Sequence, residues 1–386
     1  MTSATRARRH LVDGLRREGA LRDPRWIEAF RQVPRHVFLP RFFLPQGIRW
    51  AAVEQDDPGW LPTVYSDSVL VTQLDDDPDR WALARRSEPI AGVPTSSSSM
   101  PGIMAVMLEE LRVADGDRVL EIGTGTGYNT ALLCHRLGAA NVSTVDIDPA
   151  LLLPARATLA ALGYTPDCAV ADGEQGYPPN APYNRILCTC SVSRIPPAWL
   201  EQTRTGGLIV TTLNRPIGAG LVRIVAGDGA TGEGEVLARD GRFMPMRAHR
   251  LADAGTVLAR RAAPVARRPT ELALTTVLDP GSPFEFFVSL ELPGLSAAFD
   301  PDDGQGCFLV HPDGSWVRHH TDEHDEHFVE QGGGRRLWDA VEAAYARWQA
   351  LDRPRREQFT IIVNGAQQEI RLAEQRWPVD PPAVSA

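Results

Sequence analysis

The sequence predicts an α/β protein with a doubly wound, mostly parallel sheet, N-terminal helices and an additional C-terminal α+β domain. Two observations predict this class. From residue 118 onward, short runs rich in β-branched residues alternate with helical stretches, which is the pattern of βαβ units. A glycine-rich turn follows the first of these runs directly and opens a helix, as in Rossmann-like folds. The predicted strands are residues 118–122, 142–147, 168–171, 185–190 and 207–213.

The chain has 386 residues, which is enough for two or three domains. We expect an N-terminal helical and lid region in residues 1–95, a nucleotide-binding core in 96–248 and a C-terminal α+β domain in 249–386. Within the first region, the apolar spacing of residues 4–39 predicts helices, and residues 41–95 are mixed with one strand at 68–72. We expect the core to open with a helix that begins with residues 96–107.

The C-terminal third alternates apolar runs with turn residues. A helix is predicted at residues 336–348, and a hairpin is predicted around Asn364-Gly365, because this dipeptide suits a two-residue turn between the runs 359–363 and 368–372. Further strands are predicted at residues 285–290, 307–310 and 316–317.

The composition excludes several function classes. The net charge of −9 and a pI near 5.5 argue against a general nucleic-acid binder, which needs a basic face. All 40 basic residues are arginine, so no catalytic lysine exists. No apolar run predicts a membrane span or a signal peptide, so we expect a cytoplasmic protein. The five cysteines lack the paired spacing of a zinc site, and we interpret them as reduced core thiols.

The informative motif is the glycine turn after the first core strand, with glycines at 123, 125 and 127. Asp146, which ends the next strand, can accept hydrogen bonds from two ribose hydroxyls. Glu121 before the turn would repel a phosphate but suits the cationic cofactor S-adenosylmethionine, and Asp172 can accept from an adenine amino group. The predicted cofactor-binding residues are Glu121, Gly123, Thr124, Gly125, Thr126, Gly127, Asn129, Asp146, Ile147, Asp172 and Gly173.

These motifs resemble the protein-L-isoaspartate O-methyltransferase family over about residues 10–225. The resemblance rests on the segment Val33-Pro34-Arg35-His36-Val37-Phe38-Leu39-Pro40, a serine-rich motif before Pro101, the block 120–128 and Gly206-Gly207. It implies a Rossmann-like, S-adenosylmethionine-dependent carboxyl O-methyltransferase. The family's Thr-x-Ser-x-Pro segment lines the site where the substrate carboxylate meets the methyl group. It corresponds here to Ser97-Ser98-Ser99-Met100-Pro101, so Ser97, Ser98 and Ser99 are the candidate catalytic residues.

Three departures are similar to family variants that mature ribosomal peptides beside ATP-grasp ligases. They are the serine run 96–99, the segment 65–74 and about 135 extra C-terminal residues. The similarity implies methylation of an aspartate side chain in a cyclised precursor peptide (a graspetide), whose ester then forms an aspartimide. The precursor would arrive already macrocyclised by the ligase. The alternatives are isoaspartate repair, the equivalent lanthipeptide-modifying enzyme and a non-catalytic escort that binds the peptide.

The chemistry of a carboxylate substrate suits serine. A peptide carboxylate with a pKa of about 4 is ionised at neutral pH and needs no general base, so positioning is the main task. We expect Ser99 to orient it, with support from Ser97 or Ser98, at a helix start whose free N–H groups also favour an anion. The serine run could instead be a flexible linker.

Four histidines and four carboxylates lie close together in residues 319–327. His320 and His324 have the spacing of a metal pair, but the cluster has no apolar framing. We interpret it as a solvated acidic loop and predict no metal.

Overall fold

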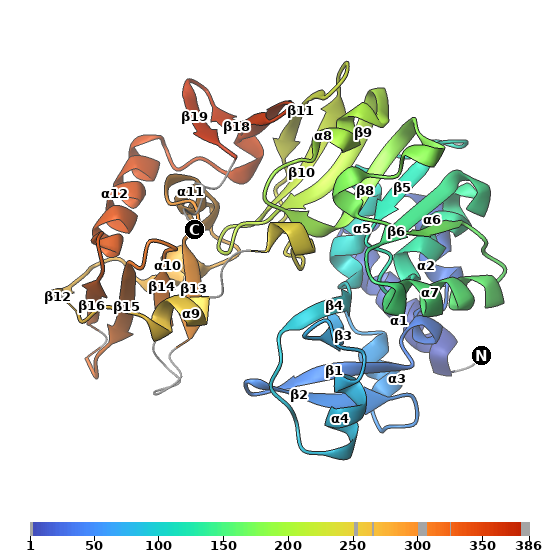
Figure 1. Ribbon diagram of the computed structural model, residues 1–386, viewed down its shortest axis with the longest axis horizontal. Helices are drawn as coiled ribbons and strands as arrows, with labels where there is room; N and C mark the ends of the chain where they lie inside the picture. Colours follow the sequence, from blue (N-terminus) through green and yellow to red (C-terminus); the bar gives the residue numbers. More distant parts are fainter. Residues whose placement is uncertain (1–2, 251–253, 265, 300–306, 325, 380–386) are drawn as a thin grey trace. The chain divides into compact units, whose positions relative to one another are not determined.

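The structure is a computed structural model that describes residues 3–250, 254–264, 266–299, 307–324 and 326–379 (Figure 1). Contacts divide the chain into two compact units. Unit 1 comprises Met1–Cys190, Pro196–Thr211 and Arg223–Gly232, and unit 2 comprises Ser191–Ile195, Thr212–Val222 and Glu233–Ala386. Three segments of the predicted core region, residues 191–195, 212–222 and 233–248, therefore group with the C-terminal residues.

Unit 1 is built on the predicted parallel sheet. Its strands follow the order β10-β9-β8-β5-β6-β7, and β5 pairs in parallel with both β6 and β8, while β6 pairs in parallel with β7. All four residues of β5 are buried, as expected of a strand covered on both faces. The bounds are β5 Val119–Ile122, β6 Val142–Asp146, β7 Asp167–Val170, β8 Tyr183–Val192, β9 Thr203–Leu213 and β10 Gly220–Ala226. The predicted α/β fold class is confirmed.

Helices accompany this sheet as the βαβ pattern predicts (Figure 1). Helix α6 packs against α2 and β6, and α7 packs against β6 and β7. Short 3₁₀ turns complete the connections. The helical bounds in unit 1 are α1 Ser3–Arg17, α2 Pro24–Gln32, η1 Arg35–Phe38, α3 Trp60–Val64, α4 Arg80–Arg86, α5 Pro101–Glu110, α6 Tyr128–Leu137, η2 Ala139–Asn141, α7 Pro149–Ala161, η3 Gly173–Gln175, η4 Pro178–Asn180 and α8 Pro197–Glu201.

A second sheet occupies the region for which only one strand was predicted. It has the order β2-β1-β3-β4, with bounds β1 Arg41–Gln46, β2 Arg49–Glu54, β3 Leu70–Leu74 and β4 Pro94–Ser98. The helix predicted to begin with residues 96–107 begins only at Pro101, because the serines before it pair with β3, with Leu70 opposite Ser98 and Val71 opposite Ser97. Serine side chains also compete with helical hydrogen bonds, which favours this outcome.

Unit 2 contains a five-stranded antiparallel sheet of order β12-β16-β15-β14-β13. Leu258, Phe308, Val310 and Trp316 form a buried cluster there. The bounds are β11 Thr231–Val236, whose first residues belong to unit 1, η5 Arg247–His249, α9 Ala254–Ala259, β12 Ala266–Pro269, α10 Leu274–Leu278, β13 Ser296–Phe299, β14 Cys307–Val310, β15 Trp316–Thr321, β16 His327–Gly332, α12 Leu337–Ala350 and η6 Arg356–Gln358.

The strand predicted at residues 285–290 is wrong, since this run lies in helix α11, Pro283–Glu291. The Ser282 side chain accepts a hydrogen bond from the Phe284 N–H at 3.2 Å, and Pro283 occupies the first helical position. Residues 284–290 are all buried. An apolar run buried on every side carries no periodicity that separates a helix from a strand.

The predicted C-terminal hairpin is confirmed. Strands β17 Thr360–Asn364 and β18 Gln367–Leu372 pair antiparallel, with Asn364 opposite Gln367, and Gly365 in the turn has a φ of 57°. A third strand, β19 Gln375–Pro378, pairs with β18. The two-residue turn thus sets the register of this ladder.

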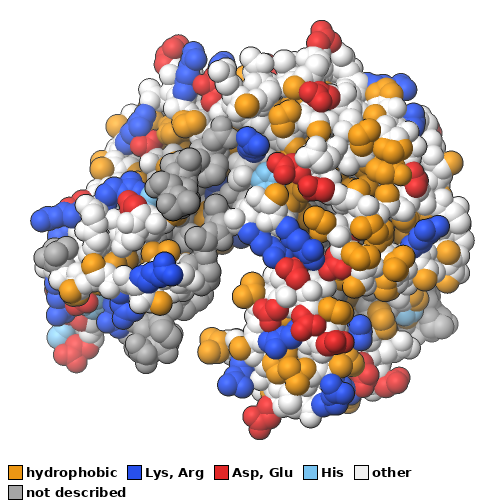
Figure 2. All heavy atoms as spheres, in the orientation of Figure 1, with side chains coloured by type: hydrophobic (Ala, Val, Ile, Leu, Met, Phe, Trp, Pro, Cys, Tyr) orange, Lys and Arg blue, Asp and Glu red, His pale blue; other side chains and the backbone are white. Residues whose placement is uncertain are grey.

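Charges of both signs are interspersed on the face drawn in Figure 2. Arginines commonly pair with carboxylates, as in Arg85 with Asp57 at 2.7 Å and Arg335 with Asp313 at 2.6 Å. Over the described ranges, no helix combines the length and the apolar character that a membrane crossing requires.

Candidate active site

The glycine turn follows β5, and three of its glycines have positive φ angles, 94° at Gly123, 52° at Gly125 and 85° at Gly127. A Cβ atom at Gly123 would lie 2.8 Å from both the Cys190 Sγ and the Thr189 Oγ1. Position 123 therefore needs glycine for space as well as for conformation. A Cβ at Gly125 would meet only the Ser97 carbonyl oxygen, at 3.7 Å. The serine segment thus lies directly beside the glycine turn.

Asp146 ends β6 and holds the same turn. Its carboxylate accepts from the Gly125 N–H at 2.9 Å and from the Asp148 N–H at 3.0 Å, and the side chain is half-buried. The next side chain, Ile147, is 42% exposed. A fixed carboxylate beside an exposed apolar side chain suits a ribose and a base.

Glu121 lies inside the protein rather than on an open surface, with no measurable exposure. Its carboxylate accepts from the Asn129 amide at 2.7 Å, from the Thr144 hydroxyl at 2.7 Å and from the Thr130 hydroxyl. Burial raises the Glu121 pKa to about 7, although the three hydrogen bonds oppose this shift. In this arrangement Glu121 and Asn129 support the shape of the turn from within, and their contact with a cofactor stays a prediction.

Asp172 and Gly173 follow β7. The exposed Asp172 carboxylate accepts from the Glu174 N–H at 3.0 Å, and the Trp199 indole donates to the Gly173 carbonyl at 2.7 Å. Because β5, β6 and β7 are parallel neighbours, their carboxyl ends bring the glycine turn, Asp146 and Asp172 to one edge of the sheet. The donors and acceptors at this edge fit S-adenosylmethionine, which Asp146, Ile147, Asp172 and the turn backbone would hold. When bound, this cofactor supplies an electrophilic methyl group.

The serines of this segment differ in burial, because side chains along strand β4 alternate between its two faces. The Ser96 and Ser98 side chains are buried; the Thr72 hydroxyl donates to the Ser96 Oγ at 3.1 Å, and the Arg35 guanidinium lies 3.5 Å from the Ser98 Oγ. Ser97 and Ser99 are half-buried, and among the described residues their hydroxyls have no hydrogen-bond partner. The geometry therefore separates Ser98 from the other two candidate catalytic residues.

The helix start next to this segment is not free, contrary to the expectation from sequence. The Asp67 carboxylate accepts from the Gly102 N–H at 2.6 Å, and a Cβ at Gly102 would lie 2.6 Å from the Asp67 Oδ2. One N–H group expected to attract a substrate anion is thus already occupied by a carboxylate. Asp67 is 35 residues away from Gly102, so only the folded chain shows this contact.

Gln73 is a further residue of the site region that the sequence reasoning did not single out. Its amide donates to the Asp148 Oδ2 at 3.0 Å, and its oxygen accepts from the Thr95 hydroxyl at 3.0 Å. Gln73 is buried and so connects the second sheet to the residues that follow Asp146. The only sequence feature that could have pointed to Gln73 was its position in the segment 65–74.

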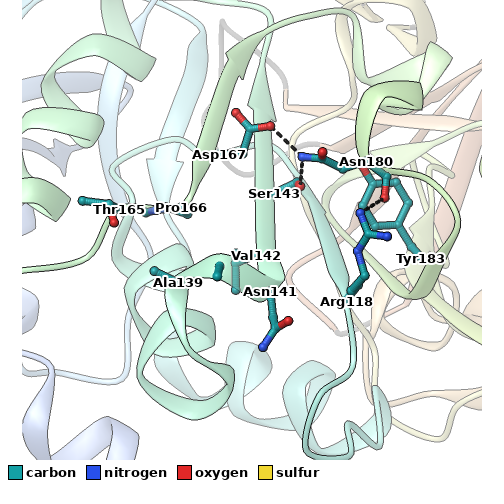
Figure 3. Close-up of a pocket in the computed structure, with 11 residues that line it drawn as sticks. Arg118, Ala139, Asn141, Val142, Ser143, Thr165, Pro166, Asp167, Asn180 and Tyr183 are labelled. Carbon is teal, nitrogen blue, oxygen red and sulfur yellow. Dashed lines mark hydrogen bonds between the residues drawn. The ribbon is translucent and has the colours of Figure 1, made fainter.

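A pocket of about 260 Å³ lies at the opposite edge of the central sheet, where β6, β7 and β8 begin (Figure 3). Its polar groups bond to one another. The Asn180 amide donates to the Ser143 Oγ at 3.0 Å and to the Asp167 Oδ2 at 2.6 Å, and Arg118 donates to the Asn180 carbonyl at 2.5 Å (Figure 3). This pocket is remote from the glycine turn and is not the candidate site.

No metal site is found within the described ranges, where no group of three or more His, Cys, Asp or Glu side chains is arranged to hold an ion. His320 lies on strand β15, and His324 lies in the connection to β16. Residue 325 of the same cluster is outside the described residues.

Comparisons with known proteins point to one family. The family model described as protein-L-isoaspartate(D-aspartate) O-methyltransferase matches residues 82–236. A protein-L-isoaspartate O-methyltransferase of Ignicoccus hospitalis is 33% identical over 205 residues, covering 53% of this chain and 80% of the relative. One of Thermococcus onnurineus is 34% identical over 203 residues, covering 52% and 75%.

A solved structure titled protein-L-isoaspartate O-methyltransferase matches with a TM-score of 0.52 at 21% identity. It covers 95% of this chain and 99% of that chain, so the likeness in fold includes the C-terminal residues. The chain therefore belongs to the protein-L-isoaspartate O-methyltransferase family, and it is an S-adenosylmethionine-dependent carboxyl methyltransferase.

Proposed function

We propose that this methyltransferase acts on an aspartate side chain of a ribosomally made precursor peptide that an ATP-grasp ligase has already macrocyclised. The methyl ester then forms an aspartimide: the backbone nitrogen of the following residue bonds to the ester carbonyl carbon, and methanol leaves. No residue of the chain is assigned to this second step. In this proposal, residues 249–386 contribute recognition of the peptide.

The observation that carries carboxylate methylation is the contact between the serine segment and the glycine turn. The Ser97 carbonyl lies beside Gly125, so a carboxylate held by the serines would be next to the predicted cofactor edge. Serine hydroxyls can orient an anion by hydrogen bonding without the strong pairing of an arginine. Their task is to align the carboxylate oxygen with the methyl carbon.

The segment 65–74 supports the choice of a peptide-maturation substrate. It resembles the variants that work beside ATP-grasp ligases, and it supplies three parts of the candidate site. Asp67 accepts a hydrogen bond from the first turn of α5, and strand β3 pairs with the serine segment. Gln73 donates a hydrogen bond to Asp148.

Isoaspartate repair is the second candidate function, and the comparisons favour it specifically. The relatives carry that name, and the solved structure with this title matches almost the whole chain in fold. The extended C-terminal part of this chain therefore does not distinguish methylation of a precursor peptide from isoaspartate repair.

The test uses two synthetic probe peptides. One is macrocyclised through a side-chain ester and contains a free Asp-Gly, and the other is a short linear peptide with isoaspartate. The proposal expects the macrocyclic aspartate to be methylated far faster, with a gain of about 14 Da. Loss of methanol as the aspartimide forms then leaves the product about 18 Da lighter than the unmodified peptide. Equal turnover, or faster turnover of the isoaspartyl peptide by mass spectrometry, would favour repair.

Serine variants test how the carboxylate is held. Ser97→Ala and Ser99→Ala should each lose about 2 to 3 kcal/mol of transition-state stabilisation, or roughly 30- to 150-fold in single-turnover rate. Cofactor affinity by calorimetry should stay nearly unchanged. Ser98→Ala is the control variant from the same segment, because the Ser98 hydroxyl is buried against Arg35. Full rates in all three variants would mean that the carboxylate is held elsewhere.

A further inference from the structure

Arg35 is a fully buried arginine at the start of η1 in unit 1, with no measurable exposure. Its guanidinium donates hydrogen bonds to two segments that are far away in sequence, residues 64–68 and 98–99. All of these acceptors are neutral: the carbonyls of Val64 at 2.8 Å, Ser66 at 3.1 Å, Ser68 at 3.2 Å and Ser99 at 3.1 Å, and the Ser98 hydroxyl at 3.5 Å.

The Arg35 guanidinium makes no ion pair with a carboxylate in the described part of the chain. The nearby carboxylate of Asp67 instead accepts from the Gly102 N–H. Burial lowers the Arg35 pKa to about 10, while Tyr128 and Asp67 oppose this shift. A buried cation without a paired anion is costly, and an apolar side chain of similar volume would often stabilise a core better. This cost argues that Arg35 serves the site rather than the stability of the fold.

The hydrogen bond from Arg35 to the Ser99 carbonyl fixes how the peptide group between Ser99 and Met100 is oriented. In a trans peptide, the carbonyl of one residue and the N–H of the next point in opposite directions. Because the Ser99 carbonyl points to Arg35, the Met100 N–H points away from it, and this N–H has no hydrogen-bond partner among the described residues. Arg35 also approaches the buried Ser98 hydroxyl. Because side chains alternate along β4, the Ser97 side chain lies on the opposite face of the strand, and the Ser99 hydroxyl makes no hydrogen bond to Arg35.

We propose that Arg35 is a positioning residue for methyl transfer, which acts by holding the serine segment so that Ser99, Ser97 and the Met100 N–H present donors to the substrate carboxylate. The inference rests on the proposed role of the serine segment. Arginine suits this task because its planar fork donates five hydrogen bonds in fixed directions, whereas the ammonium of lysine is a point charge on a flexible chain.

The same unit contains a matched control at the other edge of its sheet. Arg185 donates to the carbonyls of Leu111 at 2.8 Å and Arg112 at 2.9 Å, and it pairs with Asp117 at 3.3 Å. It thus connects loops through carbonyls as Arg35 does, at the amino end of β8 and away from the glycine turn.

The experiment measures single-turnover methylation of whichever probe peptide is the better substrate, together with cofactor affinity. Arg35→Lys should lower the rate at least tenfold and change cofactor affinity less than threefold, whereas Arg185→Lys should leave the rate within threefold. In Arg35→Ala, added guanidinium should restore part of the rate. A loss of rate and cofactor binding together in Arg35→Lys would indicate a general structural role and overturn the proposal.

A double-mutant cycle decides whether Arg35 acts through the serine. If it does, the loss of rate in Arg35→Lys combined with Ser99→Ala should be clearly smaller than the product of the two single losses, because part of the effect of Arg35→Lys passes through Ser99. Full multiplication of the two losses would refute this inference and leave the serine role intact. A full rate in both Ser97→Ala and Ser99→Ala would instead refute the serine role on which the proposed function depends, and the inference with it.

Discussion

The buried carboxylate of Glu121 predicts an unusual pH dependence of stability in the central sheet of unit 1. Burial raises its pKa from 4.5 to about 7 in the folded protein. The folded state therefore holds the proton more tightly than the unfolded state does. The protonated Glu121 therefore contributes to the free energy of unfolding. This contribution is fully present below pH 4.5 and is lost as the pH rises through about 7.

The magnitude follows from the shift. A difference of about 2.5 pKa units corresponds to about 3 kcal/mol over the whole window, of which about 2 to 3 kcal/mol falls between pH 5 and pH 8. Glu121→Gln removes the titrating proton. Its amide still offers one oxygen to Asn129, and the Thr130 and Thr144 hydroxyls can rotate to accept from its nitrogen. The variant should therefore lack this pH dependence.

Hydrogen exchange of peptides from β5 and β6, corrected for intrinsic rates, is the assay. From pH 5 to pH 8, the protection of the wild-type protein should fall roughly 30- to 150-fold further than that of Glu121→Gln. Glu109→Gln is the control, since its carboxylate accepts the Arg22 and Asp23 N–H groups near the surface. The same pH slope in the wild-type protein and Glu121→Gln would refute the reasoning.

Three further predictions concern the site and its surroundings. Asp146→Ala should weaken cofactor binding more than about a hundredfold in calorimetry, because charge-assisted hydrogen bonds of about 1.5 to 3 kcal/mol each are lost; unchanged affinity would remove Asp146 from the site. Gly123→Ala should lower the thermal midpoint more than Gly116→Ala, since both have positive φ but only position 123 is crowded; equal losses would contradict the crowding. Cys134 should resist alkylation by iodoacetamide at pH 8, because burial raises its thiol pKa, and rapid labelling by mass spectrometry would contradict this.

The placement of the glycine turn and Asp146 at one edge of the sheet, where we predict the cofactor, could be expected from sequence because each of these parts is local. Gly123 follows an apolar strand directly, and Asp146 ends the next one. Parallel strands joined by right-handed crossovers bring their carboxyl ends to one edge, so the positions along the chain were sufficient. The fold class follows from the same alternation of strands and helices.

Local patterns could not predict elements whose surroundings are set elsewhere in the chain. The run 285–290 is buried along its whole length, including the polar Glu285 and Ser289, and it became a helix because Ser282 and Pro283 start it and neighbouring elements bury every side. The serine run became a strand because β3 pairs with it. In both cases burial or pairing with distant residues decided between two elements that the short run alone left open.

The sequence by itself determined the family, the glycine turn and the candidate serines, because those depend on residue type and spacing. Only the tertiary structure decided that Ser98 is buried while Ser97 and Ser99 keep available hydroxyls, and that Arg35 has carbonyls instead of a carboxylate around its charge. The physical reason is that burial and hydrogen bonding are properties of surroundings, and the acceptors of Arg35 lie 29 to 64 residues from it in the chain.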